Sequence, residues 1–165
     1  MKRTLSTHAP EETFVSALGK MSDNDLVIFR QATGKPLGDS VAAYDLFCDL
    51  FRPIRRRAPL DKWACYLVAT LYPWHPVQED GVTLAAALRR VAQKQKDDHG
   101  RFERRALSLL ASRGAALDAS LLESVRLLAR EGIPLDWRQL LKDLSRWYEP
   151  NQPTQSAWAQ DYFIQ

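Results

Sequence analysis

Apolar residues recur every three or four positions along almost the whole chain, and this spacing restricts its fold more than any other feature. Pro, Gly and N-cap residues separate the periodic segments and mark where helices begin and end. No segment shows strong strand-like alternation, and the single Asp-Gly pair, at residues 80–81, lies between helical segments. The pattern predicts an all-α protein of about nine helices.

The helices divide into two groups on either side of a polar run, QKQKDDHG, at residues 93–100. Predicted helices of the first group begin at or just after Pro10, Ser22, Asp39, Leu60 and Thr83. Those of the second group span about 101–112, 117–131, 137–148 and 153–163. Because the polar run is typical of a mobile connection, we expect two small, closely packed bundles, 1–96 and 97–165.

The clearest helix follows Asp136, a good N-cap residue with Gln139 three positions later to bond back to it. Its apolar face is predicted to contain Trp137, Leu140, Leu141, Leu144, Trp147 and Tyr148. On another face Arg138, Lys142 and Arg146 recur every four residues. They predict a basic stripe about 12 Å long at 1.5 Å per residue.

Composition favours a core that needs no metal or disulfide, since 45% of the residues are hydrophobic and five are Trp. Cys48 and Cys65 lie in apolar helical patterns, where a free thiol behaves as a small hydrophobe. No apolar run approaches the roughly 20 residues that span a bilayer. The N-terminus lacks the hydrophobic stretch of a signal peptide, so we expect a cytoplasmic protein without membrane contact.

The usual catalytic motifs are missing from the sequence, including the P-loop and the GxSxG and HExxH patterns. His8, His75 and His99 have no metal-ligand spacing, and each is expected to be a solvated loop residue. We therefore predict no enzyme activity, no catalytic residue, no cofactor and no metal site. One alternative is a metal-free nuclease, because Arg3 and His8 have an R-x4-H spacing.

Basic residues carry the functional signal, although the net charge is only +3. Between residues 89 and 146 there are 13 Lys or Arg against 8 Asp or Glu, a local charge of +5. Arginine dominates, and its planar fork binds phosphate in a bidentate way. Trp63, Trp137, Trp147 and Trp158 lie in apolar stripes, and no stacking platform is visible. The contact predicted is with nucleic-acid backbone instead of bases.

Solvated helix faces are the competing interpretation of the same arginines. Pairs at i,i+3, such as Glu123 with Arg126 and Asp143 with Arg146, would then balance charge. Such charge-balanced, solvated helix faces would suffice for a helical protein–protein adaptor that does not bind nucleic acid directly.

A set of longer segments resembles the CasB family, the small subunit of the type I-E CRISPR Cascade surveillance complex. In the C-terminal half these segments are FERRALSLLASR, LLESVRLLAR, IPLDWRQLLKDLSRWYEP and SAWAQDYF. In the N-terminal half they are IFRQATGKPLGDSVAAY and WACYLVATLYPWHP. The resemblance covers most of residues 20–163.

This resemblance implies a nine-helix fold in two bundles and a non-catalytic role. It implies crRNA and the target and non-target DNA strands as partners, with other Cascade subunits and a second copy of the chain. The basic surface would support the guide–target duplex and the displaced strand, which stabilises the R-loop.

The nucleic-acid-binding residues that the resemblance and the basic helix face imply are Arg30, Arg57, Arg104, Arg105, Arg113, Arg126 and Arg146. At the last position the chain departs from some relatives, which place basic residues just after the tryptophan. Here Trp147 is followed by Tyr148 and Glu149.

Overall fold

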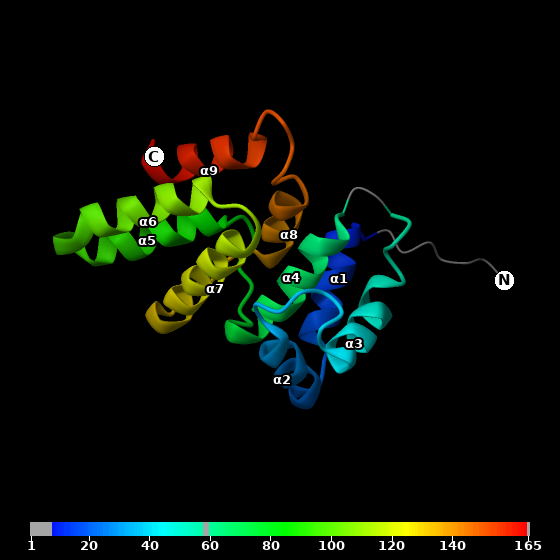
Figure 1. The fold of residues 1–165 in the computed structure, drawn as a ribbon. Helices are drawn as coiled ribbons and strands as arrows, with labels where there is room; N and C mark the ends of the chain where they lie inside the picture. The colour runs from blue at the N-terminus through cyan, green and yellow to red at the C-terminus, as the bar shows by residue number, and fades with distance from the viewer. Residues whose placement is uncertain (1–7, 58–59, 165) are drawn as a thin grey trace.

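The protein is described by a computed structural model that covers residues 8–57 and 60–164. Over these residues it contains nine α-helices, two 3-10 helices and one isolated bridge between Gln78 and Leu135, with no longer strand (Figure 1). The all-α prediction is confirmed. The α-helices are α1 (Pro10–Gly19), α2 (Asp23–Ala32), α3 (Val41–Phe51), α4 (Lys62–Leu71), α5 (Leu84–Lys94), α6 (His99–Ala111), α7 (Gly114–Glu131), α8 (Trp137–Ser145) and α9 (Pro153–Phe163). The 3-10 helices are η1 (Tyr72–Trp74) and η2 (Lys96–Asp98).

Local capping explains most helix starts. The hydroxyl of Ser22 accepts a hydrogen bond from Asp25 N at 3.2 Å, and the hydroxyl of Thr83 accepts one from Ala86 N at 3.1 Å. Both residues are helix caps, as the sequence predicts. For α3 the cap is Ser40 instead of Asp39, with Ala43 N 3.3 Å from its hydroxyl. The polar run at 93–100 is not one long connection, because η2 occupies its middle and α6 already begins at His99.

Helix α4 is buried from Ala64 to Leu71, which its almost wholly apolar sequence, WACYLVATL, explains. It packs against α2, α3 and α8, and α8 also packs against α1. Helix α5 packs against α9 and α7. The division between residues 96 and 97 stays a prediction, and both α5 and α8 pack across it (Figure 1).

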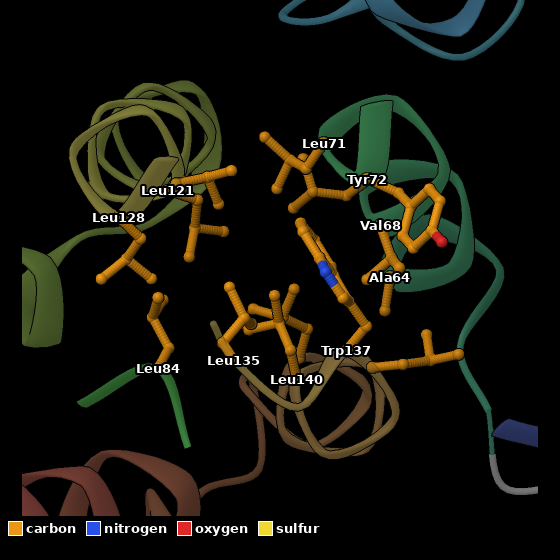
Figure 2. Close-up of a cluster of buried hydrophobic side chains, with 14 of the residues drawn as sticks. Ala64, Val68, Leu71, Tyr72, Leu84, Leu121, Leu128, Leu135, Trp137 and Leu140 are labelled. Atoms are coloured by element: carbon orange, nitrogen blue, oxygen red, sulfur yellow. The ribbon is translucent and has the colours of Figure 1, made fainter. Parts of the chain in front are cut away.

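The two groups of helices share one continuous hydrophobic cluster. Figure 2 shows its middle, where Leu121 of α7 faces Leu71 of α4 and Leu128 of α7 points toward Leu84 of α5, with Trp137 of α8 between the helices. The indole N–H of the fully buried Trp137 donates to the His75 carbonyl at 3.1 Å. A buried tryptophan thus fixes the segment that connects α4 with α5.

The other tryptophans of the apolar stripes separate into two kinds. Trp147 and Trp158 are 0% and 1% exposed, and their rings pack together at 5.2 Å between centroids. Trp63 is only partly buried and lies against Tyr148, at 5.5 Å. The core assignment is therefore confirmed for the buried members, whereas Trp63 lies at the edge of the core.

His75 corrects one prediction. It is 7% exposed, and its Nε2 hydrogen-bonds the Ile133 carbonyl at 2.7 Å. His75 is therefore a buried residue that joins the segment after η1 to the segment after α7, and not a solvated loop residue. The η1 turn points it inward, which composition alone does not indicate. His8 and His99 are exposed as expected, but His99 is the first residue of α6 and not a loop residue.

Cys65 is buried as predicted, and burial raises the pKa of its thiol to about 12, with the charge of Asp61 acting in the same direction. In the part of the chain that the structure describes, no three metal-ligating side chains are grouped to hold an ion. Of the R-x4-H pair, Arg3 lies outside the described residues. None of the described helices is both long and apolar enough to cross a bilayer.

Candidate nucleic-acid interface

The short helix η1 places Trp74 between α2 and α7, which both pack against it. Trp74 Nε1 donates to Thr33 Oγ1 at 2.9 Å. Thr33 is the C-cap of α2, and its hydroxyl also lies 2.7 Å from the Arg30 carbonyl and 2.9 Å from the Thr70 carbonyl. The indole plane is therefore held by the ends of two helices.

Two arginines lie against the Trp74 ring. The Cζ atom of Arg30, in the last turn of α2, is 4.2 Å from the ring centroid. The Cζ atom of Arg126, from α7, is 5.4 Å from it. Neither guanidinium has a carboxylate within 4.0 Å or a hydrogen bond to any described residue. A cation attracted to a ring through its flat face keeps the N–H donors on its edge available.

A surface hollow of about 300 Å³ adjoins Arg126. It lies between α6 and α7, and its walls are Arg105, Glu123, Arg126, Leu127 and Arg130. The expected pair of Glu123 with Arg126 is not formed, since no N···O distance between them is within 4.0 Å. Three guanidinium groups therefore share one hollow with one carboxylate.

These residues form what we call the Trp74 surface: Arg30, Trp74, Arg105, Arg126 and Arg130. It unites side chains from α2, η1, α6 and α7, which the sequence separates by up to a hundred positions. Of the seven predicted binding residues it brings together three, Arg30, Arg105 and Arg126.

The remaining predicted residues lie elsewhere or have partners. Arg57 donates to the His8 carbonyl, and Arg104 Nε donates to the Gly100 carbonyl at 3.2 Å. Arg113 precedes α7 and lies over the Tyr148 ring at 5.6 Å. It is about 20 Å from Arg126 along the helix axis, at 1.5 Å per residue.

Arg146 is bound by Glu149, whose carboxylate accepts from Nε at 3.0 Å and from Nη2 at 3.1 Å. This fork hydrogen bond raises the pKa of Arg146 and lowers that of Glu149. The expected partner Asp143 is half-buried and instead accepts a hydrogen bond from the indole N–H of Trp158 at 2.8 Å. Burial raises the pKa of Asp143, although that hydrogen bond acts in the opposite direction.

The other basic residues of α8 are paired as well. Arg138 lies 2.7 Å from Asp80 and 3.7 Å from Glu12, and Lys142 lies 3.9 Å from Glu11. The stripe predicted for this helix exists, but it does not form a free positive surface.

The N-cap of the same helix differs in detail from the predicted capping box. Asp136 accepts from Gln139 N at 3.1 Å as expected, but the Gln139 side chain donates to Asp143 at 2.8 Å instead of bonding back. Asp136 also accepts from Gly81 N at 2.9 Å and from the Gln78 amide at 2.8 Å. The cap thus joins α8 to the loop that precedes α5.

Sequence reasoning misses Trp74. The segment YPWHPVQEDG predicts a loop, and only Trp63, Trp137, Trp147 and Trp158 lie in predicted apolar stripes. One signal was present: Trp74 lies between Pro73 and Pro76 and belongs to no helical stripe. Its pairing with arginines from α2 and α7 depends on long-range packing and leaves no local pattern.

The family model for the CRISPR-associated protein Cse2 matches residues 25–163. The chain belongs to the Cse2 family. A CRISPR-associated protein Cse2 from Thermus thermophilus is 36% identical over 104 residues, which are 62% of this chain and 57% of that relative's length. This confirms the resemblance to the CasB family seen in the sequence.

Solved structures agree with the family membership. The crystal structure of CasB from Thermus thermophilus has a TM-score of 0.76 at 27% identity and covers 94% of this chain and 99% of its own. The crystal structure of M. ruber CasB has a TM-score of 0.78 at 24% identity, with 94% of this chain and 93% of that chain covered. The second likeness concerns the fold alone.

Proposed function

We propose that this Cse2-family chain is a non-catalytic subunit of the type I-E CRISPR Cascade complex, and that its Trp74 surface binds nucleic-acid backbone. The single observation that carries the proposal is the grouping of Arg30, Arg105 and Arg126 with no carboxylate within 4.0 Å of any of them among the described residues. Other Cascade subunits and a second copy of the chain would be its protein partners.

The chemistry of the surface favours phosphate over an acidic protein. Guanidinium forks match phosphate oxygens in geometry, and each phosphate neutralised releases counterions and adds sequence-independent affinity. Three helices contribute the charges, so the surface is suited to an extended polyanion. In an R-loop, base pairing between crRNA and target would read the sequence, while the protein would hold the duplex and the displaced strand by charge.

Arg57, Arg104 and Arg113 stay predictions as further contacts that would extend the surface. Each is free of a carboxylate within 4.0 Å among the described residues. Arg146 is expected to contribute less to binding, because its two hydrogen bonds to Glu149 would first have to break.

The experiment is a reconstituted Cascade complex carrying Arg105→Glu and Arg126→Glu, with the lifetime of the R-loop on target DNA measured against wild type. We expect a clearly shorter lifetime, with an unchanged melting temperature of the isolated subunit, since both side chains lie at the surface. A control with Arg52→Glu and Arg90→Glu, two arginines that pair with Asp49 and Glu79 and lie outside the predicted binding set, changes the net charge equally and should keep the lifetime.

A wild-type lifetime for the Arg105 and Arg126 variant would contradict the proposal. A protein–protein adaptor predicts that outcome. It also predicts that the isolated chain shows no steep salt dependence in gel shifts with DNA or RNA.

A further inference from the structure

We infer that Trp74 is a positioning residue that holds the guanidinium groups of Arg30 and Arg126 in place to bind one phosphate backbone. The inference rests on the proposed function, and it concerns a residue that itself carries no charge. Trp74 would act on the polyanion only through the two arginines.

The ring is fixed before any ligand arrives. Its Nε1 donates to Thr33 Oγ1 at 2.9 Å, and Thr33 is itself placed by the carbonyls of Arg30 and Thr70, at 2.7 and 2.9 Å. An indole held at its N–H cannot rotate freely about its side-chain bonds. It therefore offers the arginines a surface of constant position.

Contact with this ring orders long side chains while leaving their binding groups unused. An arginine that is free in solvent loses rotamer freedom when it binds, which weakens binding. Arg30 and Arg126, at 4.2 and 5.4 Å from the ring centroid, have given up part of that freedom already. Their edge N–H donors make no hydrogen bond to a described residue and point to no carboxylate partner.

Direct base stacking on Trp74 is a different role for the same ring. In single-strand binders an aromatic face stacks with a base. Here two guanidinium groups already lie against the ring, so a base would have to displace them. The contacts therefore favour backbone binding through arginine, and the two roles differ in whether bases are needed.

The test uses the full-length chain and fluorescence anisotropy with two labelled single strands of equal length, one with bases and one abasic throughout. Trp74→Leu removes the aromatic face, Trp74→Phe keeps a face without the N–H, and Thr33→Val removes the hydroxyl that holds the indole. We expect Trp74→Leu to bind about tenfold more weakly to both strands, because two cation–π contacts are lost. The Phe and Val variants keep an aromatic face but lose the hydrogen bond that holds it, so both should bind about threefold more weakly than wild type.

The salt dependence separates positioning from direct contact. Trp74→Leu should leave the slope of log K against log salt unchanged, since the same phosphates are neutralised. Arg126→Gln should reduce that slope by about 0.7 on a single strand. Melting of each variant reports its fold, and if Trp74→Leu is destabilised, the Phe and Val variants measure ring support in a folded chain.

Wild-type affinity for both Trp74→Leu and Thr33→Val, together with a reduced slope for Arg126→Gln, would overturn the inference and leave the proposed function intact. A loss confined to the strand with bases would overturn it in favour of stacking. An unchanged slope and affinity for Arg126→Gln would overturn the proposed function, and the inference with it.

Discussion

Two pairs of arginines are in opposite situations: Arg138 and Arg146 at α8, and Arg30 and Arg126 at the Trp74 surface. Arg138 of α8 hydrogen-bonds Asp80, in the loop before α5. Arg146, just past the end of α8, hydrogen-bonds Glu149. At the Trp74 surface, Arg30 and Arg126 lie against an indole ring and pair with no described carboxylate. An aromatic neighbour orders a guanidinium without using its N–H donors, whereas a carboxylate uses them. The partner of each arginine therefore decides whether its charge is available.

For Arg138 the difference arises from packing between helices, whereas Arg146 pairs with Glu149 only three residues further along the chain. Helix α8 packs against α1, whose first turn contributes Glu11 and Glu12, so these acidic residues meet the basic face of α8. Exposed pairs of this type are worth about 0–1 kcal/mol each. Their main consequence for function is that they neutralise a surface that the sequence makes strongly positive.

The largest expected effect compares two triple variants with the same change in net charge. Replacing Arg30, Arg105 and Arg126 by Gln should weaken DNA binding of the isolated chain about 100-fold, because charge-assisted hydrogen bonds to phosphate are lost. Replacing Arg138, Lys142 and Arg146 by Gln should change it less than about threefold. Gel shifts at one fixed salt concentration measure both, and equal losses would mean that only total charge matters.

Asp136 tests the structural role of the α8 region. Burial alone would raise its pKa, but hydrogen bonds from Gly81 N, the Gln78 amide and Gln139 N, with the charge of Arg138, hold the pKa below its ordinary value. The folded state therefore gains stability from the ionised carboxylate above the unfolded pKa, and this gain is lost as the pH falls through the folded pKa.

Asp136→Ala should consequently lower the free energy of unfolding by about 1–2 kcal/mol at pH 7, the usual effect of removing an N-cap. Urea unfolding of both proteins at pH 7 and at pH 3 checks this, and the difference between them should narrow at the lower pH. A constant difference would show that the charge of Asp136 does not contribute.

A smaller effect is expected from Arg138→Gln. Its pairs with Asp80 and Glu12 are partly exposed, so the free energy of unfolding should fall by less than about 1 kcal/mol. DNA affinity should stay at the wild-type value. A clear loss of affinity with intact stability would place α8 within the binding surface.

Much of the fold could be predicted from local sequence. The caps at Ser22, Thr83 and Asp136, and the buried faces of α4 and α8, follow from spacing and from short-range chemistry. The burial of His75 could not, since its partner Ile133 is distant in the sequence.

The candidate site was predictable in kind but not in detail. The abundance of arginine between residues 89 and 146 indicated a polyanion. Which arginines stay free depends on where α1 meets α8 and where Trp74 meets α2 and α7. These are tertiary contacts, and the local pairs of Arg126 with Glu123 and of Arg146 with Asp143 did not form. Arg146 is held by a different local partner, Glu149.

The most direct measurement of the central claim is the salt dependence of duplex DNA binding for Arg126→Gln and Arg146→Gln. Each removes one positive charge from an exposed arginine. If availability of the guanidinium decides binding, the slope of log K against log salt should fall by about 0.9 for Arg126→Gln and stay unchanged for Arg146→Gln. Equal slopes for the two variants would contradict the account.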